Sequence, residues 1–599
     1  MLKKFFMNTL SSFMGAWLAL VLFCVVAVLV GIGVVSKLGS AVGKSQEIKR
    51  ESVLVIDLNG PIIEREIPTE FDYVSLLKGD LERPATLTSL LTAIGEAKVN
   101  DNISAIYLKC GGVQAAPATL NALRDALIDF REDGEKDVIA YGDSYGMGDY
   151  FVASVADKIY LNPAGQVELK GLGGTNMFLK GLFDKLGVEF QVVKVGTYKS
   201  AVEPYINTEM SAPARAQLDT LYGNMWRYIT DNIRVDRKMI KDDIDSLINN
   251  DFIFIRDAAY DKAHGLVDEL CYESSMDTIV ADMIGKEVKK LNYVSPSALL
   301  SQTDWGSAYA ANKKIAVLYA TGEIVDGGGA ATINYEKLVP QIMKLADDKT
   351  VLGMVLRVNS PGGAVFGSEQ IGQALDAFQS RGKTLAVSMG DYAASGGYWI
   401  SCCADRIFAD PLTITGSIGI FGLIPNAKGL MDKIGVNPQT VSTNPDAAFP
   451  SLYYPMNGKQ KDAMQKYVES GYDKFVARVA RGRKMPEAKV RLIGEGRVWD
   501  AMKAIEIGLV DEQGSLYEAV DWVAEREELS DSYDVAVYPS IESTMWDMLP
   551  ELANMDIHGS VAGLLDGGYE RYMLKFAESV LKQKPIQARM PYMFVEFTR

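Results

Sequence analysis

Hydrophobic and polar positions follow two alternating patterns along most of the chain. Short apolar runs such as SVLVIDLNG (52–60) and KIAVLYATG (314–322) are typical of buried strands, and each ends at a glycine. Longer stretches with helical periodicity lie between such runs, for example PATLNALRDALIDF (117–130). Strands that alternate with helices predict βαβ units and a mostly parallel sheet, so the expected fold class is α/β.

The first apolar run of the chain has a different character. No charged residue occurs from residue 5 to residue 36, and the centre of this run, residues 15–35, contains 21 residues. A helix of that length spans about 32 Å at about 1.5 Å per residue, which is enough to cross a bilayer. The apolar core of a cleavable signal peptide is much shorter. The pattern predicts a single transmembrane anchor, but basic residues flank it on both sides, so charge leaves its orientation open.

The chain also contains an internal repeat. GDSYGMGDYFVASVADKIYLNP (142–163) resembles GDYAASGGYWISCCADRIFADP (390–411), and GLFDKLGV (181–188) resembles GLMDKIGV (429–436). Throughout residues 103–201, each position pairs with the one 248 positions further on. Such self-similarity predicts two homologous α/β domains in tandem.

The repeat and the apolar run divide the chain into six parts. These are a short N-terminal segment (1–14), a transmembrane helix (15–35), a linker (36–51), an N-terminal domain (52–300), a C-terminal domain (301–525) and a C-terminal tail (526–599). Two amphipathic patterns in the tail, residues 543–557 and 570–583, predict helices. Packing on the domains is the default for these helices, and contact with lipid is the alternative.

Composition excludes several classes of protein. A chain of 599 residues is too long for one core, and 48% hydrophobic with 23% charged residues is typical of globular domains. Acidic residues outnumber basic ones by 77 to 61, for a net charge of −16, which argues against a nucleic-acid partner. The five cysteines form no CxxC pair, so we expect neither a disulfide framework nor a metal site, and no motif indicates a cofactor.

Two reactive side chains each occur in only one copy of the repeat. Ser395 in AASGG corresponds to Met147, whereas Lys199 in VGTYKSAVEP corresponds to Ala447. The simplest explanation is an ancestral single-domain enzyme whose site combined a serine and a lysine from neighbouring copies. After fusion each half kept one of the two. Unrelated drift is the alternative, because a shared fold does not imply a shared site.

A nucleophilic serine needs a group that accepts its proton. The only histidines are His264, whose repeat counterpart is Ile507, and His558 in the tail, and neither is well placed for a catalytic triad. A neutral lysine can serve instead if its pKa falls by about three units, which costs roughly 4 kcal/mol and is within reach of burial. Glu203, four residues after Lys199, would oppose this shift if its carboxylate lay nearby.

Two further motifs could complete such a site. RVNSPGG (357–363) ends a strand with two glycines and precedes a helical pattern, so it is either a turn that presents backbone amides to an oxyanion or a structural turn. Ser417 in ITGSIGIFG (414–422) has no counterpart in the first copy. Its hydroxyl could accept a hydrogen bond from the lysine amine, or it could be a simple turn serine.

The four motifs GTYKSAVEP (196–204), RVNSPGG (357–363), AASGGYWI (393–400) and ITGSIGIFG (414–422) together resemble the bacterial signal peptide peptidase family, also called protease IV, in its long tandem form. The resemblance extends from the predicted anchor to about residue 525. It implies two tandem Clp-protease/crotonase-like domains with an N-terminal transmembrane helix. It also implies a serine–lysine dyad and no cofactor.

Carried over position by position, the resemblance makes Ser395 the nucleophile and Lys199 the general base. It makes Gly363 an oxyanion donor together with the amide of Gly396. Ser417 is the candidate for orienting the lysine. The family resemblance further implies a membrane-anchored homo-oligomer, typically a tetramer, that degrades cleaved signal peptides and other unfolded apolar peptides. Its catalytic domains would lie on the periplasmic side of the cytoplasmic membrane, where the adjacent Cys402 and Cys403 would be unusual.

Two other functions stay open on the sequence alone. A membrane-tethered scaffold or adaptor could retain a relic of the site without catalysis. A crotonase-type enzyme acting on acyl-CoA could use the glycine amides to bind a thioester oxygen, although crotonases use carboxylates as acid and base and need no membrane anchor.

Overall fold

The structure is a computed structural model. It describes residues 48–65, 84–132, 134–239, 241–249, 256–303, 313–327, 332–529, 533–539 and 586–590. The predicted anchor (15–35) and the two helical patterns of the tail lie outside these ranges. Among the residues that are described, none of the helices combines the length and the hydropathy of a membrane span.

The first half of the chain forms a parallel sheet in the order β2-β1-β3-β4-β5-β7, with β8 also paired to β1. The strands are β1 (Ser52–Ile63), β2 (Ala85–Thr86), β3 (Ile103–Gln114), β4 (Asp137–Gly142), β5 (Lys158–Leu161), β7 (Glu269–Leu270) and β8 (Tyr293–Val294). The helices are α3 (Leu87–Val99), α4 (Pro117–Arg131), α5 (Met147–Ala153), α6 (Lys180–Leu186), α7 (Glu203–Ile206), α8 (Ala212–Asp236), α9 (Lys241–Asn249), α10 (Ala258–Ala263), α11 (Met276–Met283) and α12 (Pro296–Gln302).

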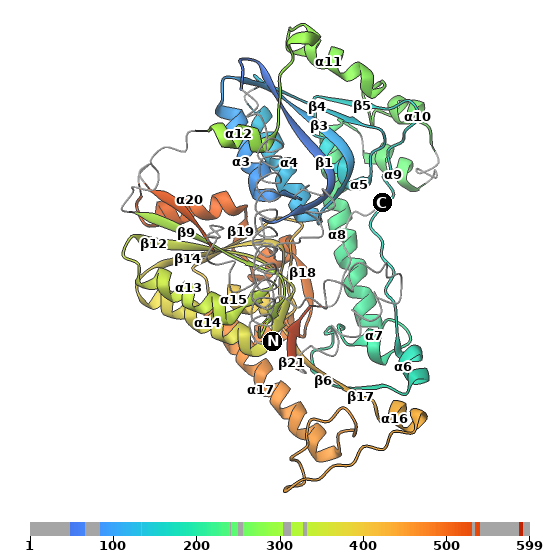
Figure 1. The fold of residues 1–599 in the computed structure, drawn as a ribbon, viewed down its shortest axis with the longest axis vertical. Helices are drawn as coiled ribbons and strands as arrows, with labels where there is room; N and C mark the ends of the chain where they lie inside the picture. The colour runs from blue at the N-terminus through green and yellow to red at the C-terminus, as the bar shows by residue number, and fades with distance from the viewer. Residues whose placement is uncertain are drawn as a thin grey trace, which may run out of the picture.

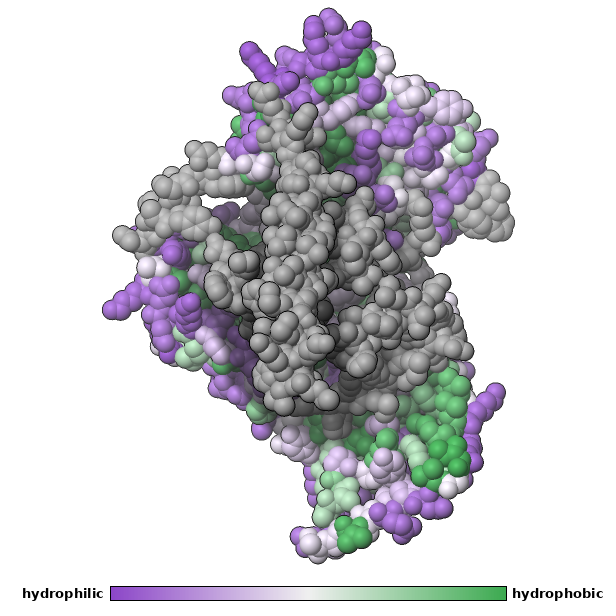
Figure 2. All heavy atoms as spheres, viewed as in Figure 1, coloured by the Kyte–Doolittle hydropathy of each residue, from purple (hydrophilic) through white to green (hydrophobic). Residues whose placement is uncertain are grey.

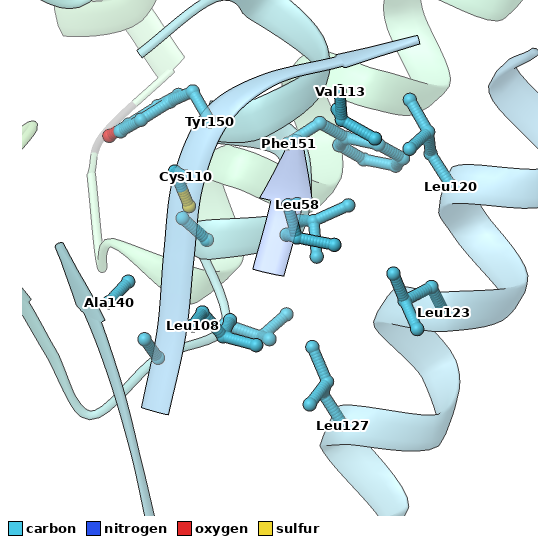
Figure 3. Packing of buried hydrophobic residues seen from close by; sticks show 14 of the residues in the cluster. Leu58, Leu108, Cys110, Val113, Leu120, Leu123, Leu127, Ala140, Tyr150 and Phe151 are labelled. Atoms are coloured by element: carbon cyan, nitrogen blue, oxygen red, sulfur yellow. The ribbon is translucent and has the colours of Figure 1, made fainter. Parts of the chain in front are cut away.

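The core of this half lies between the sheet and the helices that cover it. Leu120, Leu123 and Leu127 recur at helical spacing on α4 and point toward Leu58 and Leu108 of the central strands (Figure 3). These central strands read as near-continuous apolar runs because both of their faces are covered.

The second half repeats this architecture in the order β18-β16-β14-β12-β9-β20, with β15 paired to β14 and β19. Its strands are β9 (Lys314–Thr321), β12 (Val351–Ser360), β14 (Thr384–Ala394), β15 (Arg406–Ala409), β16 (Ile414–Gly416), β18 (Val498–Asp500), β19 (Glu512–Gln513) and β20 (Asp534–Tyr538). Its helices are α13 (Tyr335–Asp347), α14 (Val365–Ser380), α15 (Gly396–Ser401), α16 (Lys428–Ile434), α17 (Gly458–Gly482), α18 (Glu487–Ile493), α19 (Ala501–Ile507) and α20 (Leu516–Arg526).

The repeat inferred from the sequence is visible in matching elements. The helices α6 and α16 begin and end 248 positions apart, and each stops at a left-handed glycine, Gly187 or Gly435. The structure thus confirms two tandem α/β units with largely parallel sheets. The assignment of these units to the Clp-protease/crotonase type rests on the resemblance and stays a prediction.

A third sheet joins the two halves, in the order β11-β10-β13-β21-β17-β6. Its strands β21, β17 and β6 are labelled in Figure 1. Its strands are β11 (Ile333–Asn334), β10 (Ile324–Val325), β13 (Gly362–Ala364), β21 (Ile586–Arg589), β17 (Ile420–Asn426) and β6 (Glu189–Val195). The first half contributes β6, which runs antiparallel to β17 with Val195 opposite Ile420 and Glu189 opposite Asn426. The repeat-related residues 172–178 and 437–443 are described and form no strand, so the described chain builds this composite sheet once.

The region from residue 526 onward contributes strands to two of the sheets. Its strand β20 pairs in parallel with β9 of the second half, and β21 pairs with β13 and β17. Short strands of this kind carry little periodicity of their own, because their partners lie far away in the sequence.

A buried polar network connects the two halves beside the composite sheet. The Arg357 guanidinium on β12 donates to Glu64 Oε1 at 2.7 Å and to Ser388 Oγ at 2.8 Å. Asn359 Nδ2 lies 3.0 Å from both Glu64 Oε2 and Asp391 Oδ2. Arg357 and Glu64 are buried, so the ion pair ties the end of the first-half strand β1 to the strand that leads into the RVNSPGG turn.

Replacement of Arg357 by alanine should destabilise the fold, because it leaves the Glu64 carboxylate buried without its partner. We expect a loss of about 3–5 kcal/mol in the free energy of unfolding, measured by urea titration of the transition that reports on the second half. Arg406→Ala, which removes a half-exposed ion pair with Glu512, is the matched control and should cost about 1 kcal/mol or less. Equal losses for both variants would contradict this role of the buried pair.

Candidate active site

Lys199 lies in a turn just beyond the end of β6. Gly196 begins this turn at a φ of 111°, in the region that favours glycine. The Tyr198 amide then donates to the carbonyl of Glu495 at 2.9 Å, so a loop of the second half holds the turn in place. A methyl group on Gly496 of that loop would lie 2.7 Å from Cβ of Lys199, which shows how closely the loop backbone packs on the lysine stem.

Ser395 occupies the predicted junction between strand β14 and helix α15. Its φ of 57° and ψ of −112° are strained for a residue with a side chain. Two backbone hydrogen bonds hold this conformation, from the Ser395 amide to the Gly416 carbonyl and from the Trp399 amide to the Ser395 carbonyl, each 2.8 Å long.

The two side chains meet within one chain. Lys199 Nζ lies 2.8 Å from Ser395 Oγ, 3.0 Å from Ser417 Oγ and 3.1 Å from the Ser417 carbonyl oxygen. All three residues have no solvent-exposed surface. Burial lowers the pKa of the Lys199 amine well below its ordinary value, because an ammonium loses its hydration there and gains no carboxylate partner.

Glu203, which could have opposed this shift, faces another partner. Its carboxylate accepts hydrogen bonds from the Ser211 amide at 3.0 Å and from the Ser211 hydroxyl at 2.6 Å, at the start of helix α8. The carboxylate therefore supports a helix end and does not pair with the Lys199 amine.

The contacts around Nζ suit an uncharged amine. A neutral primary amine has two N–H donors and one lone pair, whereas an ammonium has three donors and no lone pair. The two Ser417 oxygens can accept both N–H groups, which leaves the lone pair directed at the hydroxyl of Ser395. For the neutral amine that burial favours, the serine O–H donates to nitrogen, whereas an ammonium would donate to all three oxygens.

The backbone amides of Gly363 and Gly396 lie close to each other beside the serine. A methyl group on Gly396 would lie 3.1 Å from the Gly363 nitrogen and 2.6 Å from Ser368 Oγ. Gly363 itself has a φ of 154° and pairs with Ile324, whose backbone leaves no room for a side chain there. Both glycines are therefore required for the close approach of β13, β10 and α15.

The tail strand β21 runs past these amides. Its Ala588 lies opposite Gly363 in the antiparallel pairing with β13, while Ile586 lies opposite Gly422 of β17. The Ala588 carbonyl oxygen would lie 3.2 Å from a methyl group on Gly396. The site is thus covered by an extended segment of the chain's own tail.

The two histidines and the possible metal ligands are the candidates that remain. His264 follows helix α10 as its C-terminal cap and stacks on Tyr260 with ring centroids 3.8 Å apart, and neither contact involves Ser395 or Lys199. His558 is outside the described residues. Across the described ranges, no group of three His, Cys, Asp or Glu side chains could hold a metal ion.

Sequence reasoning did not single out the loop that packs on Lys199. The glycines of its GEG motif, Gly494 and Gly496, correspond to Asp251 and Ile253 in the first half when HGLVDE is aligned with IGLVDE. They are therefore another feature that only one half has, which is the same signal that marked Ser395 and Lys199.

Comparisons with known proteins agree on one family of peptidases. Peptidase family S49 matches residues 131–288 and again residues 377–530. The chain is 37% identical to Protease 4 of Haemophilus influenzae over 80% of this chain and 79% of that protein, and 34% identical to Protease 4 of Salmonella typhi over 91% and 88%. It is 26% identical to the chloroplastic serine protease SPPA of Arabidopsis thaliana over 79% of this chain and 69% of that protein.

The two matches fall in the two halves of the repeat, and the Protease 4 relatives are aligned along most of their length. The strained serine, the buried lysine and the paired glycine amides lie in one enclosed site. The chain belongs to peptidase family S49, with that domain in tandem as in the Protease 4 relatives, and it is a serine protease.

Proposed function

We propose that this protein is an endopeptidase in which Ser395 is the nucleophile and Lys199 the general base. The observation that carries the proposal is the 2.8 Å contact between Lys199 Nζ and Ser395 Oγ in a site without solvent exposure. Such a distance is within the range required of a nucleophile and its base.

The proposed reaction has two stages. Ser395 Oγ forms a bond to the carbonyl carbon of the substrate while its proton passes to Lys199 Nζ. The tetrahedral intermediate then collapses, the C–N bond breaks, and the Lys199 ammonium gives its proton to the departing amine. In the second stage Lys199 takes a proton from water, the hydroxide attacks the acyl ester, and the proton returns to Ser395 Oγ.

The amides of Gly363 and Gly396 are the proposed donors to the negative oxygen of the intermediate. A preorganised donor in such a position contributes about 2.7–4 kcal/mol to transition-state stabilisation. Ser417 is the proposed positioning residue, because both of its oxygens contact the amine and direct its lone pair to the serine.

The edges of the composite sheet support a proposed substrate class. β13 and β17 each pair with one side of β21, so they present two edges separated by the width of a single strand. Only an extended peptide can pair with both edges, which favours unfolded chains over folded proteins. Ala588 of β21, which lies opposite Gly363, has no exposed surface, so a substrate residue that took its place would need a small side chain. Cleaved signal peptides, which are extended and rich in small and aliphatic residues, fit these requirements.

The proposal includes attachment to a membrane through residues 15–35, with the catalytic domains on the outer side of the cytoplasmic membrane and no cofactor. Tethering would raise the local concentration of peptides left in the bilayer. It also includes a homo-oligomer, as the family resemblance suggests. An apolar area over α6 and α16 supports an interface (Figure 2), and its exposed residues include Leu182, Leu186, Ile434 and Val436.

Lys199→Met and Ser395→Ala should each lower kcat/KM for a short apolar reporter peptide by at least about 10³, and the double variant should lose no more, because the two groups act in one step. A serine-directed fluorophosphonate should label Ser395 in the unmodified chain and react far more slowly with Lys199→Met. Lys158→Met, at an exposed lysine on β5, is the matched control and should retain full activity. Normal turnover by either site variant would refute the dyad.

The rate should rise with pH through the lowered pKa of Lys199, because the neutral amine is the active form. The free energy of unfolding should also rise with pH. Between the lowered folded pKa and the unfolded value of about 10.4, the unfolded chain binds one more proton, so the free energy of unfolding increases with pH in that window. Lys199→Met should lack this contribution to the slope. A kcat/KM profile that first rises near the ordinary lysine pKa would contradict the role of burial.

Leu186→Asp combined with Ile434→Asp should reduce the molar mass of the detergent-solubilised full chain, because two carboxylates in the apolar area oppose an interface. Light scattering coupled to size-exclusion chromatography measures this. Val99→Asp, at an exposed apolar position on α3, is the control and should leave the mass unchanged. The proposed interface is excluded if the double variant retains the mass of the unmodified protein.

A further inference from the structure

The helix α15, which begins directly after Ser395, ends at two adjacent cysteines. Cys402 caps this helix and is fully buried, whereas Cys403 is partly exposed. Their Sγ atoms lie 3.9 Å apart. The repeat places Ser154 and Val155 of the first half opposite them, so the thiol pair, like the active-site serine, occurs in the second half only.

Cys403 lines a cavity of about 540 Å³ between the helices α14, α17 and α20. Cavities of roughly 300–1,000 Å³ are typical of sites for small molecules. Three aspartates and four basic side chains also line it, and the basic residues are Arg481, Arg483, Lys484 and Arg526. The cavity thus offers a small molecule both a thiol and positively charged groups.

The surroundings of Cys403 are those of a reactive thiol. Arg481 Nη2 lies 3.7 Å from its Sγ, and the Cys402 thiol is placed to donate to the same atom. The hydrogen bond from Cys402 lowers the pKa of the Cys403 thiol. The positive charges of Arg478 and Arg481 lower it further, whereas burial and the Asp376 carboxylate oppose the shift. Burial raises the pKa of the Cys402 thiol, so Cys402 stays protonated and Cys403 carries the nucleophilic thiolate.

Cys271 in the first half provides an internal comparison, since it is also partly exposed. Burial and the Glu269 carboxylate raise the pKa of its thiol, which is the opposite direction. Cys110 and Cys402 are buried. Among the cysteines that the structure describes, Cys403 therefore combines access from a cavity with a thiolate stabilised by neighbouring groups.

The backbone around Cys403 is closely packed and leads back to the nucleophile. A methyl group on Gly482, the last residue of α17, would lie 2.9 Å from Cys403 Cα. Arg478 of the same helix donates to the Trp399 carbonyl at 3.1 Å, and the Trp399 amide donates to the carbonyl of the strained Ser395 at 2.8 Å. A group attached to Cys403 therefore bears on α17 and, through it, on the turn that carries Ser395.

We propose that Cys403 is a modification site, at which a small disulfide bearing carboxylates attaches by thiol–disulfide exchange and reversibly slows the protease. The thiolate attacks one sulfur of the disulfide, a new S–S bond forms, the old one breaks, and the released thiolate takes a proton from water. Exchange replaces the negative thiolate by an uncharged disulfide, so the four basic and three acidic side chains leave an excess of positive charge that a carboxylate offsets. The slowing rests on the proposed function, because it acts through Ser395, whereas the attachment does not.

Mass spectrometry of the full-length protein measures the attachment. With glutathione disulfide at pH 7, Cys403 should gain the tripeptide at least about tenfold faster than Cys271, because its thiolate fraction is larger. Arg481→Met should slow this reaction about threefold or more, since it removes a neighbouring cation. Arg491→Met, at a half-exposed arginine on α18, is the matched control and should leave the rate unchanged. Equal rates at Cys403 and Cys271 would overturn the site.

Cystamine, a small disulfide that carries amines, tests the preference for carboxylates. Each rate at Cys403 is divided by the rate of the same disulfide with free cysteine, which removes the difference in intrinsic reactivity. Glutathione disulfide should then react at least about tenfold faster, because the basic side chains attract it. Equal corrected rates, or a preference for cystamine, exclude the anionic class of ligand.

Turnover of a reporter peptide tests the consequence of attachment. The modified protein should show a kcat lowered about threefold or more, because a displaced nucleophile attacks less efficiently, and dithiothreitol should restore it. Cys403→Val, which introduces the residue of the first half, should be insensitive to the disulfide. Full activity of the completely modified protein would refute the slowing. Failure of the proposed function looks different, because the protein would then neither cleave the reporter nor react at Ser395 with a fluorophosphonate, while Cys403 would still gain the tripeptide.

Discussion

The antiparallel pairing of β6 with β17 is the contact on which the active site depends. β6 comes from the first half and leads into the turn that carries Lys199, whereas β17 comes from the second half and follows Ser417. Pairing of the two strands over their full length therefore sets the position of the lysine relative to the serines. The loop around Gly496 then closes over the lysine stem, so the amine reaches Ser395 in an enclosed space.

Enclosure determines the chemistry proposed for the amine. The ammonium form of a lysine is stabilised by water or by a carboxylate, and Lys199 has neither, because Glu203 is engaged with Ser211. The low pKa thus follows from where the side chain lies. The polar contacts that remain, to two oxygens of Ser417 and one of Ser395, match the donors and the lone pair of a neutral amine.

The edges of the composite sheet also bear on the proposed recognition of substrates. An unpaired strand edge readily pairs with any extended chain, and β13 and β17 would expose two such edges facing each other without β21. Backbone pairing accepts many sequences, which agrees with the unfolded substrates proposed above, while the buried position of Ala588 has room for only a small side chain. In the structure the tail strand β21 pairs with these edges and so covers them.

The amino-acid sequence predicted much of this arrangement. Alternating strand and helix patterns indicated two tandem α/β units, and the constant offset allowed Ser395 and Lys199 to be compared with Met147 and Ala447. That comparison was informative because a catalytic residue is needed in only one copy of the repeat. A reactive side chain that one copy has and the other lacks is therefore a candidate for the site. The comparison also marked Ser417, and the family resemblance added Gly363 and Gly396 as candidates. The structure places all three near the serine and the lysine.

Other features depended on contacts between residues far apart in the chain. Whether Glu203 lies against the lysine, whether the serine and lysine meet within one chain, and what the tail covers are questions of distance, which residue patterns do not contain. The strand β21 has only four residues and acquires its structure from β13 and β17. Local pattern determined which residues form strands, helices and turns, whereas pairing and burial between distant segments decided which of them share a site, because those energies exist only once the chain has folded.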